Sequence, residues 1–143
     1  MRGERGQALV IAAILIGIGA LAIVGLRAVQ DHVLASAAAQ DAGEAAVEAA
    51  AAVMADAYVA RIDSLRAHAF DVPRPTPDII GMLADPATRE SARTAAAEAA
   101  ARNGQVFDGG IDARCVGATI EVELRHAGRL HRAAVQADAC SQR

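Results

Sequence analysis

Two cysteines are the residues of this chain best suited to covalent chemistry. Cys115 and Cys140 lie near the C-terminus, and the sequence contains no other cysteine. Two thiols are too few for a four-ligand zinc site, and no histidine pair supplies the remaining ligands. They can form a single disulfide if the compartment that holds them is oxidising.

The histidines and acidic residues near the C-terminus are the next candidates for a site. His126 and His131 flank an expected turn, and a solvated hairpin end explains them better than a metal site does. Glu121 and Glu123 share one face of an expected strand, as the paired carboxylates of glycosidases can. No cleft is expected around them, so we interpret both as solvent-facing strand residues.

The remaining motifs and the charge also predict no catalysis. The serines stand in no nucleophile-elbow pattern, and Gly109-Gly110 belongs to a turn rather than to a phosphate-binding loop. The net charge of −3 disfavours a protein that binds the nucleic-acid backbone, which requires a basic face. We therefore expect a non-enzymatic protein that uses no cofactor or metal and binds neither nucleic acid nor a small-molecule substrate.

A long uncharged stretch near the N-terminus precedes all the elements that carry these candidate residues. Ala8 to Leu26 is nineteen residues without a charge; as a helix it is about 28 Å long, close to the roughly 30 Å hydrocarbon core of a bilayer. It predicts a transmembrane helix, which we assign to residues 7–27 after a short basic leader of residues 1–6. A cleaved secretory signal is the alternative, but its best site, Ala35-Ser36-Ala37, lies eleven residues past Leu26, which is poor spacing.

The charges on either side of this stretch predict its orientation. Residues 1–26 carry +1, which leaves −4 for residues 27–143. Because positive flanks stay in the cytoplasm, we expect a single-pass protein of the cytoplasmic membrane whose C-terminal part faces outward, where a disulfide can form. Small residues on one face of the membrane helix would permit close approach of a second helix: Ala13, Gly17 and Ala20.

The helix is expected to continue beyond the membrane over residues 28–72. The stretch from Arg27 to Phe70 contains no proline and one glycine, Gly43, and alanine is the best helix former. Apolar residues spaced by three or four form one stripe along this helix: Val47, Ala51, Met54, Tyr58, Ile62 and Leu65. We interpret the stripe as a packing seam for the chain's own C-terminal part, for a partner helix, or for both.

Residues 73–143 are expected to form a small outer α+β region. The run from Pro73 to Pro77 stops the long helix, and Asp85-Pro86 starts a second helix that ends at Asn103-Gly104. Alternating residues at 118–124 predict a half-buried strand, and a second strand follows the turn at 127–128. The predicted fold class is α+β: a long N-terminal helix with a membrane half and an outer half, then a second helix and a C-terminal β-hairpin.

The register of this hairpin bears on the two cysteines. A two-residue turn at Ala127-Gly128 pairs residues whose numbers sum to 255, so that Glu123 faces Arg132 and acid meets base. The same sum places Cys115 directly opposite Cys140, which predicts a disulfide at the open end of the hairpin. A bulge in the first strand would shift this register by one, and two free thiols would require the opposite topology.

The start of the chain resembles that of a known family. Arg5 to Val10, followed by a long apolar run, resembles the start of the TadE/TadG-like proteins of the Flp (tight-adherence) pilus system. The alanine-rich run at 40–52 and the segment 99–104 are similar to segments that follow in that family. The resemblance implies a component of type IV pilus assembly, a minor pilin or pseudopilin, with the membrane and other pilins or pilus-assembly proteins as partners.

The resemblance also implies a leader cleavage between Gly6 and Gln7. Pilins of this system carry a glutamate at the fifth position after the leader glycine, where this chain has Ile11. That glutamate supports assembly into a filament, so Ile11 resembles the TadG-like members, which are similar to anchors more than to shaft subunits. The alternatives are a bitopic exported adaptor subunit of another envelope or secretion complex and, from another class, a small membrane-tethered enzyme or ligand-binding protein.

Overall fold

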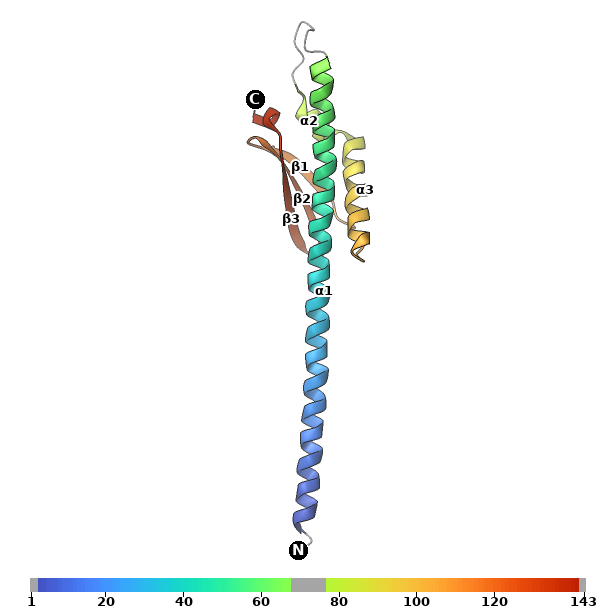
Figure 1. The fold of residues 1–143 in the computed structure, drawn as a ribbon, viewed down its shortest axis with the longest axis vertical. Coiled ribbons are helices and arrows are strands. Elements are labelled where there is room, and N and C mark those ends of the chain that lie inside the picture. The colour runs from blue at the N-terminus through green and yellow to red at the C-terminus, as the bar shows by residue number, and fades with distance from the viewer. Residues whose placement is uncertain (1–2, 68–76, 142–143) are drawn as a thin grey trace. The chain divides into compact units, whose positions relative to one another are not determined.

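The computed structural model describes residues 3–67 and 77–141, with side chains described from residue 10 onward. Its elements are α1 (Gly3–Ala67), α2 (Ile79–Ala84), α3 (Pro86–Arg102), β1 (Ile111–Val116), β2 (Thr119–His126), β3 (Arg129–Gln136) and the short 3₁₀ helix η1 (Asp138–Ser141) (Figure 1). Contacts divide the chain into two compact units, Met1–Ala37 and Ala38–Arg143, called here the first unit and the outer unit. The predicted α+β class is confirmed.

Helix α1 is unbroken because its sequence holds no proline and is dominated by alanine and other good helix formers. It contributes all the described backbone of the first unit and continues into the outer unit. Its last described residue is Ala67. The predicted extension to residue 72 and most of the proline run that was expected to stop the helix lie outside the described residues.

Helices α2 and α3 begin at aspartate caps, as the Asp85-Pro86 signal predicts for α3. The amide of Gly81 donates to the Asp78 carboxylate at 2.8 Å, and the amide of Thr88 donates to the Asp85 carboxylate at 2.9 Å. These bonds satisfy backbone donors that a helix start leaves unpaired. Helix α3 ends before Gly104, whose φ of +71° is the left-handed conformation that glycine adopts readily.

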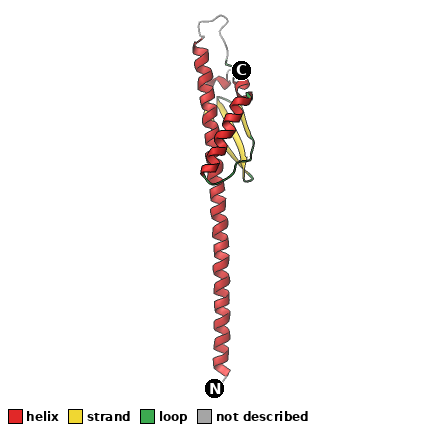
Figure 2. Ribbon diagram, turned by 90° about the vertical axis from the view of Figure 1, so that its right-hand side faces the viewer, coloured by secondary structure: helices red, strands yellow, loops and turns green. Residues whose placement is uncertain are grey.

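The three strands form one antiparallel sheet in the order β1-β2-β3. Figure 2 shows this sheet in yellow. Strands β2 and β3 pair in the predicted register, with numbers that sum to 255 from His126–Arg129 to Thr119–Gln136. The prediction of a hairpin alone was wrong, because the chain reverses earlier, at Gly117-Ala118. Gly117 has a φ of +58° and allows this tight turn, which makes residues 111–116 a separate strand.

The core of the outer unit lies between α1, α3 and the inner face of the sheet. Its largest fully buried side chains are Met54 of α1 and Ile120, Val122 and Leu124 of β2. Small residues bring the helices close to this face, and α1 contributes three alanines that the predicted seam did not include: Ala42, Ala46 and Ala50. Close packing of alanine faces lets a small unit of 106 residues bury a continuous core.

Only part of the predicted seam is buried. Val47, Ala51 and Met54 are buried, and Tyr58 packs partly buried against the core. Ile62 and Leu65 are half-buried and do not belong to the core cluster, so the seam against the chain's own core ends before them. The hydroxyl of Tyr58 accepts a hydrogen bond from the amide of Ala139 in η1, which follows the sheet. The last two turns of α1 come after Tyr58 in the helix.

The predicted disulfide between Cys115 and Cys140 is confirmed, with Cα atoms 5.5 Å apart. The predicted pairing of the two cysteines in one ladder was wrong. Cys115 is in β1 and lies opposite Ile120, whereas Cys140 is in η1 after the end of β3. The turn at Gly117-Ala118 is the reason, since it folds β1 back before β2 begins. The bond therefore ties the first strand to the C-terminal 3₁₀ helix.

Candidate functional site

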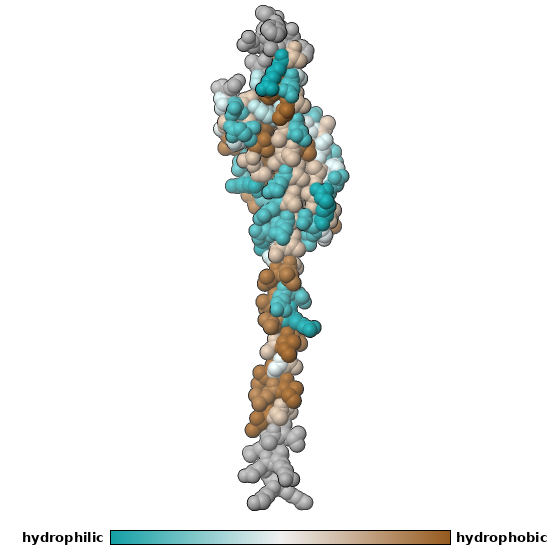
Figure 3. All heavy atoms as spheres, viewed as in Figure 1, coloured by the Kyte–Doolittle hydropathy of each residue, from teal (hydrophilic) through white to brown (hydrophobic). Residues whose placement is uncertain are grey.

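The apolar part of α1 in the first unit is the most extensive candidate surface of this chain. Every side chain from Val10 to Ala35 is exposed, and this stretch carries most of the large exposed apolar residues that the structure describes. Brown spheres mark its apolar residues in Figure 3. Among the described residues, α1 is the one helix that is long and apolar enough to cross a membrane. Its composition and exposure are consistent with membrane association.

The small residues predicted for helix packing lie on this exposed stretch. Ala13, Gly17 and Ala20 are all exposed, and a Cβ added at Gly17 would meet no atom of this chain. No contact within the described chain therefore requires glycine there. The backbone of Gly6 and Gln7, the expected cleavage position, belongs to α1, and their side chains are outside the description.

The outer face of the sheet carries a cluster of ion pairs rather than a pair of catalytic carboxylates. The Arg114 guanidinium donates to Glu121 and to Glu123 at 2.8 Å each, and Arg132 lies 2.7 Å from Glu123. The hydrogen bond to Glu121, followed by that to Glu123, raises the pKa of Arg114 above its ordinary value. The sequence prediction of solvent-facing carboxylates missed their main partner, because Arg114 belongs to the strand that was not predicted.

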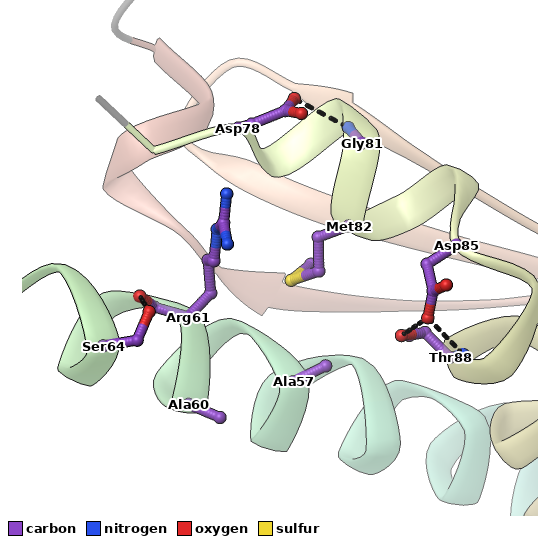
Figure 4. Close-up of a pocket in the computed structure, with 9 residues that line it drawn as sticks. All are labelled: Ala57, Ala60, Arg61, Ser64, Asp78, Gly81, Met82, Asp85 and Thr88. Atoms are coloured by element: carbon purple, nitrogen blue, oxygen red, sulfur yellow. Dashed lines mark hydrogen bonds between the residues drawn. The ribbon is translucent and has the colours of Figure 1, made fainter. Parts of the chain in front are cut away.

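A cavity of about 510 Å³ lies within the outer unit, between the end of α1 and α2. Figure 4 shows Arg61 and Ser64 on α1, with Met82 projecting from α2 opposite. The two carboxylates at its edge, Asp78 and Asp85, are occupied as helix caps. Donation from the backbone amide and then the hydroxyl of Thr88 lowers the pKa of Asp85.

These groups support the local fold, and those that belong to the described part of the chain do not assemble a catalytic constellation. The Ser64 hydroxyl donates to the carbonyl of Arg61 at 2.8 Å, and none of the described residues that line the cavity is a histidine that could act as its base. In the described ranges, 3–67 and 77–141, no group of three or more histidine, cysteine, aspartate or glutamate side chains could hold a metal ion.

His126 and His131 are buried, and the prediction that they are solvated was wrong. Their exposed fractions are 5% and 8%, and no other polar or charged side chain in the described part of the chain is buried. The strand register explains the error, because these two positions share the inner face with Leu124 and Val122. An exposed turn therefore does not imply exposed side chains beside it, because alternate strand positions face the core.

Comparison with known proteins gives no relative for this chain. No family model, no curated protein and no solved structure matches it. The site must therefore be interpreted from its own geometry: an exposed apolar helix, and an outer unit with a disulfide and no assembled catalytic groups among its described residues.

Proposed function

We propose that this chain is a non-enzymatic component of a pilus-assembly machine, a minor pilin or pseudopilin anchored in the cytoplasmic membrane with its outer unit outside the cell. The observation that carries the proposal is the unbroken helix α1, Gly3–Ala67, which supplies both the exposed apolar stretch and the spine of the outer unit. In such a protein the N-terminal part of one continuous helix inserts into the membrane, and the rest of the same helix carries the folded unit.

Three further features support this proposal. The TadE/TadG-like pattern at Arg5 to Val10 is the kind of start that this function uses. The disulfide between Cys115 and Cys140 suits an oxidising compartment outside the cytoplasm. The carboxylates of Asp78, Asp85, Glu121 and Glu123 are engaged in helix caps and ion pairs of the outer unit, which favours packing over chemistry.

Deletion of the gene in the source organism tests the function. We expect the deletion strain to lose surface pili in electron micrographs and the full chain to restore them. A chain truncated after Ala37 serves as the control, because it keeps the apolar helix and lacks the outer unit; we expect it to insert without restoring pili.

The rival function is an exported adaptor of another envelope complex. Cross-linking in native membranes separates the two, since the pilus proposal expects a cross-link to pilins or pilus-assembly proteins. Normal pili in the deletion strain, together with cross-links to a different envelope complex, would establish the adaptor and refute the pilus proposal.

A further inference from the structure

The outer edge of β1 leaves backbone groups of the sheet without partners. Residues of an antiparallel pair alternate between positions that exchange backbone hydrogen bonds and positions that do not. Val116 and Thr119 flank the two-residue turn and form a pair of the first kind. Ala113 and Cys115 are positions of the second kind, so their N–H and C=O groups point away from β2. Within residues 3–67 and 77–141, no backbone group outside the sheet forms a hydrogen bond with them.

A cavity of about 220 Å³, called here the β1 groove, lies between this edge and the helices α2 and α3. Helix α2 contacts both β1 and α3. It lines the groove with apolar side chains: Ile80, Leu83 and Ala84. Ile80 is large and apolar and yet 48% exposed. An extended segment laid along β1 would cover this side chain while its backbone pairs with the strand.

Arg89 of α3 gives the β1 groove a positive charge in a fixed position. Its Nε atom donates to the carbonyl of Leu83 at 2.8 Å, which holds the guanidinium beside the groove. The other guanidinium of the lining, that of Arg114, is already engaged by Glu121 and Glu123. None of the described residues that line the groove is acidic. The groove therefore combines an apolar wall with a cation and favours an acidic ligand.

We propose that the β1 groove binds an extended segment of another protein, which adds to β1 as a fourth strand and places a carboxylate side chain against Arg89. Hydrogen bonds to the backbone of Ala113 and Cys115 supply affinity. Arg89 and Ile80 select a segment that carries an acidic and an apolar residue on one face, because alternate side chains of an added strand point the same way. This surface goes beyond the proposed function and does not depend on it.

A second copy of this chain fits the β1 groove less well than a foreign segment does. Paired through its own β1, the copy would turn Ile111, Ala113 and Cys115 toward the helices, since these alternate residues lie on the inner face of the sheet. None of the three carries a charge that could pair with Arg89. An acidic side chain at one of these positions of a foreign segment supplies that charge.

The test measures the binding of a fluorescent peptide to the full chain in detergent micelles by anisotropy. The probe is Thr-Val-Thr-Asp-Thr-Val-Thr, which places its aspartate and both valines on one face of a strand, and the control peptide has asparagine in place of aspartate. We expect the wild type to bind the probe about tenfold more tightly than the control, because the control lacks the charge-assisted bond. Arg89→Gln should bind both peptides equally. Arg102→Gln, which removes an exposed arginine at the other end of α3, should keep the difference.

The variant Ala113→Pro tests the strand edge itself. Proline removes an outward N–H group and takes no hydrogen bond from the ladder, so binding of both peptides should weaken about tenfold with an unchanged circular dichroism spectrum. If this variant does not fold, Ile80→Asp replaces it. That change keeps every buried side chain and puts a carboxylate at an exposed position of the groove, where it should repel the probe.

Equal affinity of the wild type for the two peptides, or no binding of either at millimolar concentration, would overturn the proposal. Binding that neither Ala113→Pro nor Ile80→Asp weakens would place the peptide elsewhere and would also refute it. Sedimentation of the chain without peptide examines the remaining occupant. A dimer that Ala113→Pro dissociates would identify a second copy in the groove and exclude the foreign segment.

Discussion

At the scale of single residues, Gly43 illustrates how strongly one position on a helix can depend on a distant strand. Gly43 is the one glycine between Arg27 and Ala67 of α1, and the ring of His131 occupies the space of its missing side chain. In an ordinary exposed helix, replacing glycine by alanine stabilises the helix by up to about 1 kcal/mol. Here the added methyl group must displace a buried ring, and overpacking costs about 1–3 kcal/mol.

We therefore expect Gly43→Ala to lower the free energy of unfolding by about 1–2 kcal/mol, opposite in sign to the usual effect. Urea unfolding at pH 7.5 measures it. Combining Gly43→Ala with His131→Ala provides the control, because alanine at residue 43 should then be neutral or stabilising. A stabilising effect of Gly43→Ala alone would show that the ring moves away at little cost.

A second residue-scale prediction concerns the buried face of α1. Met54 is fully buried and Asp56, two residues later, is exposed. Met54→Asp removes an apolar side chain worth about 1.5–3 kcal/mol and inserts a carboxylate without a partner. We expect this change to lower the free energy of unfolding by more than about 3 kcal/mol, and Asp56→Ala to change it by less than about 0.5 kcal/mol. Similar values for the two variants would mean that the buried face is assigned wrongly.

Sequence reasoning identified the large members of this face and missed the small ones. Val47 and Met54 stand out by hydrophobicity, so their spacing predicts a seam. Alanine occurs on every side of this helix, and its pattern alone does not distinguish the buried Ala46 from the exposed Ala52. The opposite error at His126 and His131 arose because residue type was given more weight than strand alternation.

At the scale of secondary-structure elements, α3 depends on the charge of Asp85. Donation from Thr88 lowers the pKa of this carboxyl, so the folded chain holds it ionised more readily than the unfolded chain does. The stabilisation is present above the ordinary pKa of aspartate, about 4, and is lost as the pH falls through the lowered value.

We expect Asp85→Ala to lower the melting temperature at pH 7, and Asp85→Asn to lower it less, because asparagine also caps helices. Thermal melts between pH 2 and pH 5 should show a weaker pH dependence for Asp85→Asn than for the wild type. Identical acid profiles for wild type and Asp85→Asn would contradict the role of the charged cap.

The disulfide supports the sheet at the same scale. It closes a loop with a sequence separation of 25 residues, which the chain-entropy model converts to about 3.5 kcal/mol of stability. The variant Cys115→Ser/Cys140→Ser should lose about this amount, and the wild type under reducing conditions should match the variant. Peptide mapping without reductant, on protein from native membranes, should recover the linked pair; free thiols at both positions would contradict the outward orientation.

The elements themselves were largely predictable. The caps of α3 and the Ala127-Gly128 turn carry local signals that fix a helix start and a strand register. Strand β1 was missed because Ala113 and Cys115 on its inner face are small, and alternation between small and charged residues is a weak pattern. From sequence alone, the residues around Gly117-Ala118 are compatible with one continuous strand. The turn becomes evident only from the left-handed φ of Gly117 in the structure.

At the scale of the whole molecule, α1 belongs to both units, so removing its N-terminal part would separate the outer unit from the apolar stretch that we propose as a membrane anchor. We expect the protein isolated from membranes to begin at Met1 or, after leader cleavage, at Gln7. Intact mass and N-terminal sequencing measure this directly. A mature protein that begins near Ala38 would instead identify the first unit as a discarded signal and exclude the anchor.

The contact between Tyr58 and η1 gives this molecule an intrinsic optical probe. Tyr58 is the one tyrosine of a chain that has no tryptophan. Its hydroxyl accepts a hydrogen bond from the backbone amide of Ala139, the neighbour of Cys140. Ultraviolet emission excited in the tyrosine band therefore originates at a single place, where α1 meets the C-terminal turn. Changes in its intensity or lifetime report whether that junction is closed, without any label and without interference from the rest of the chain.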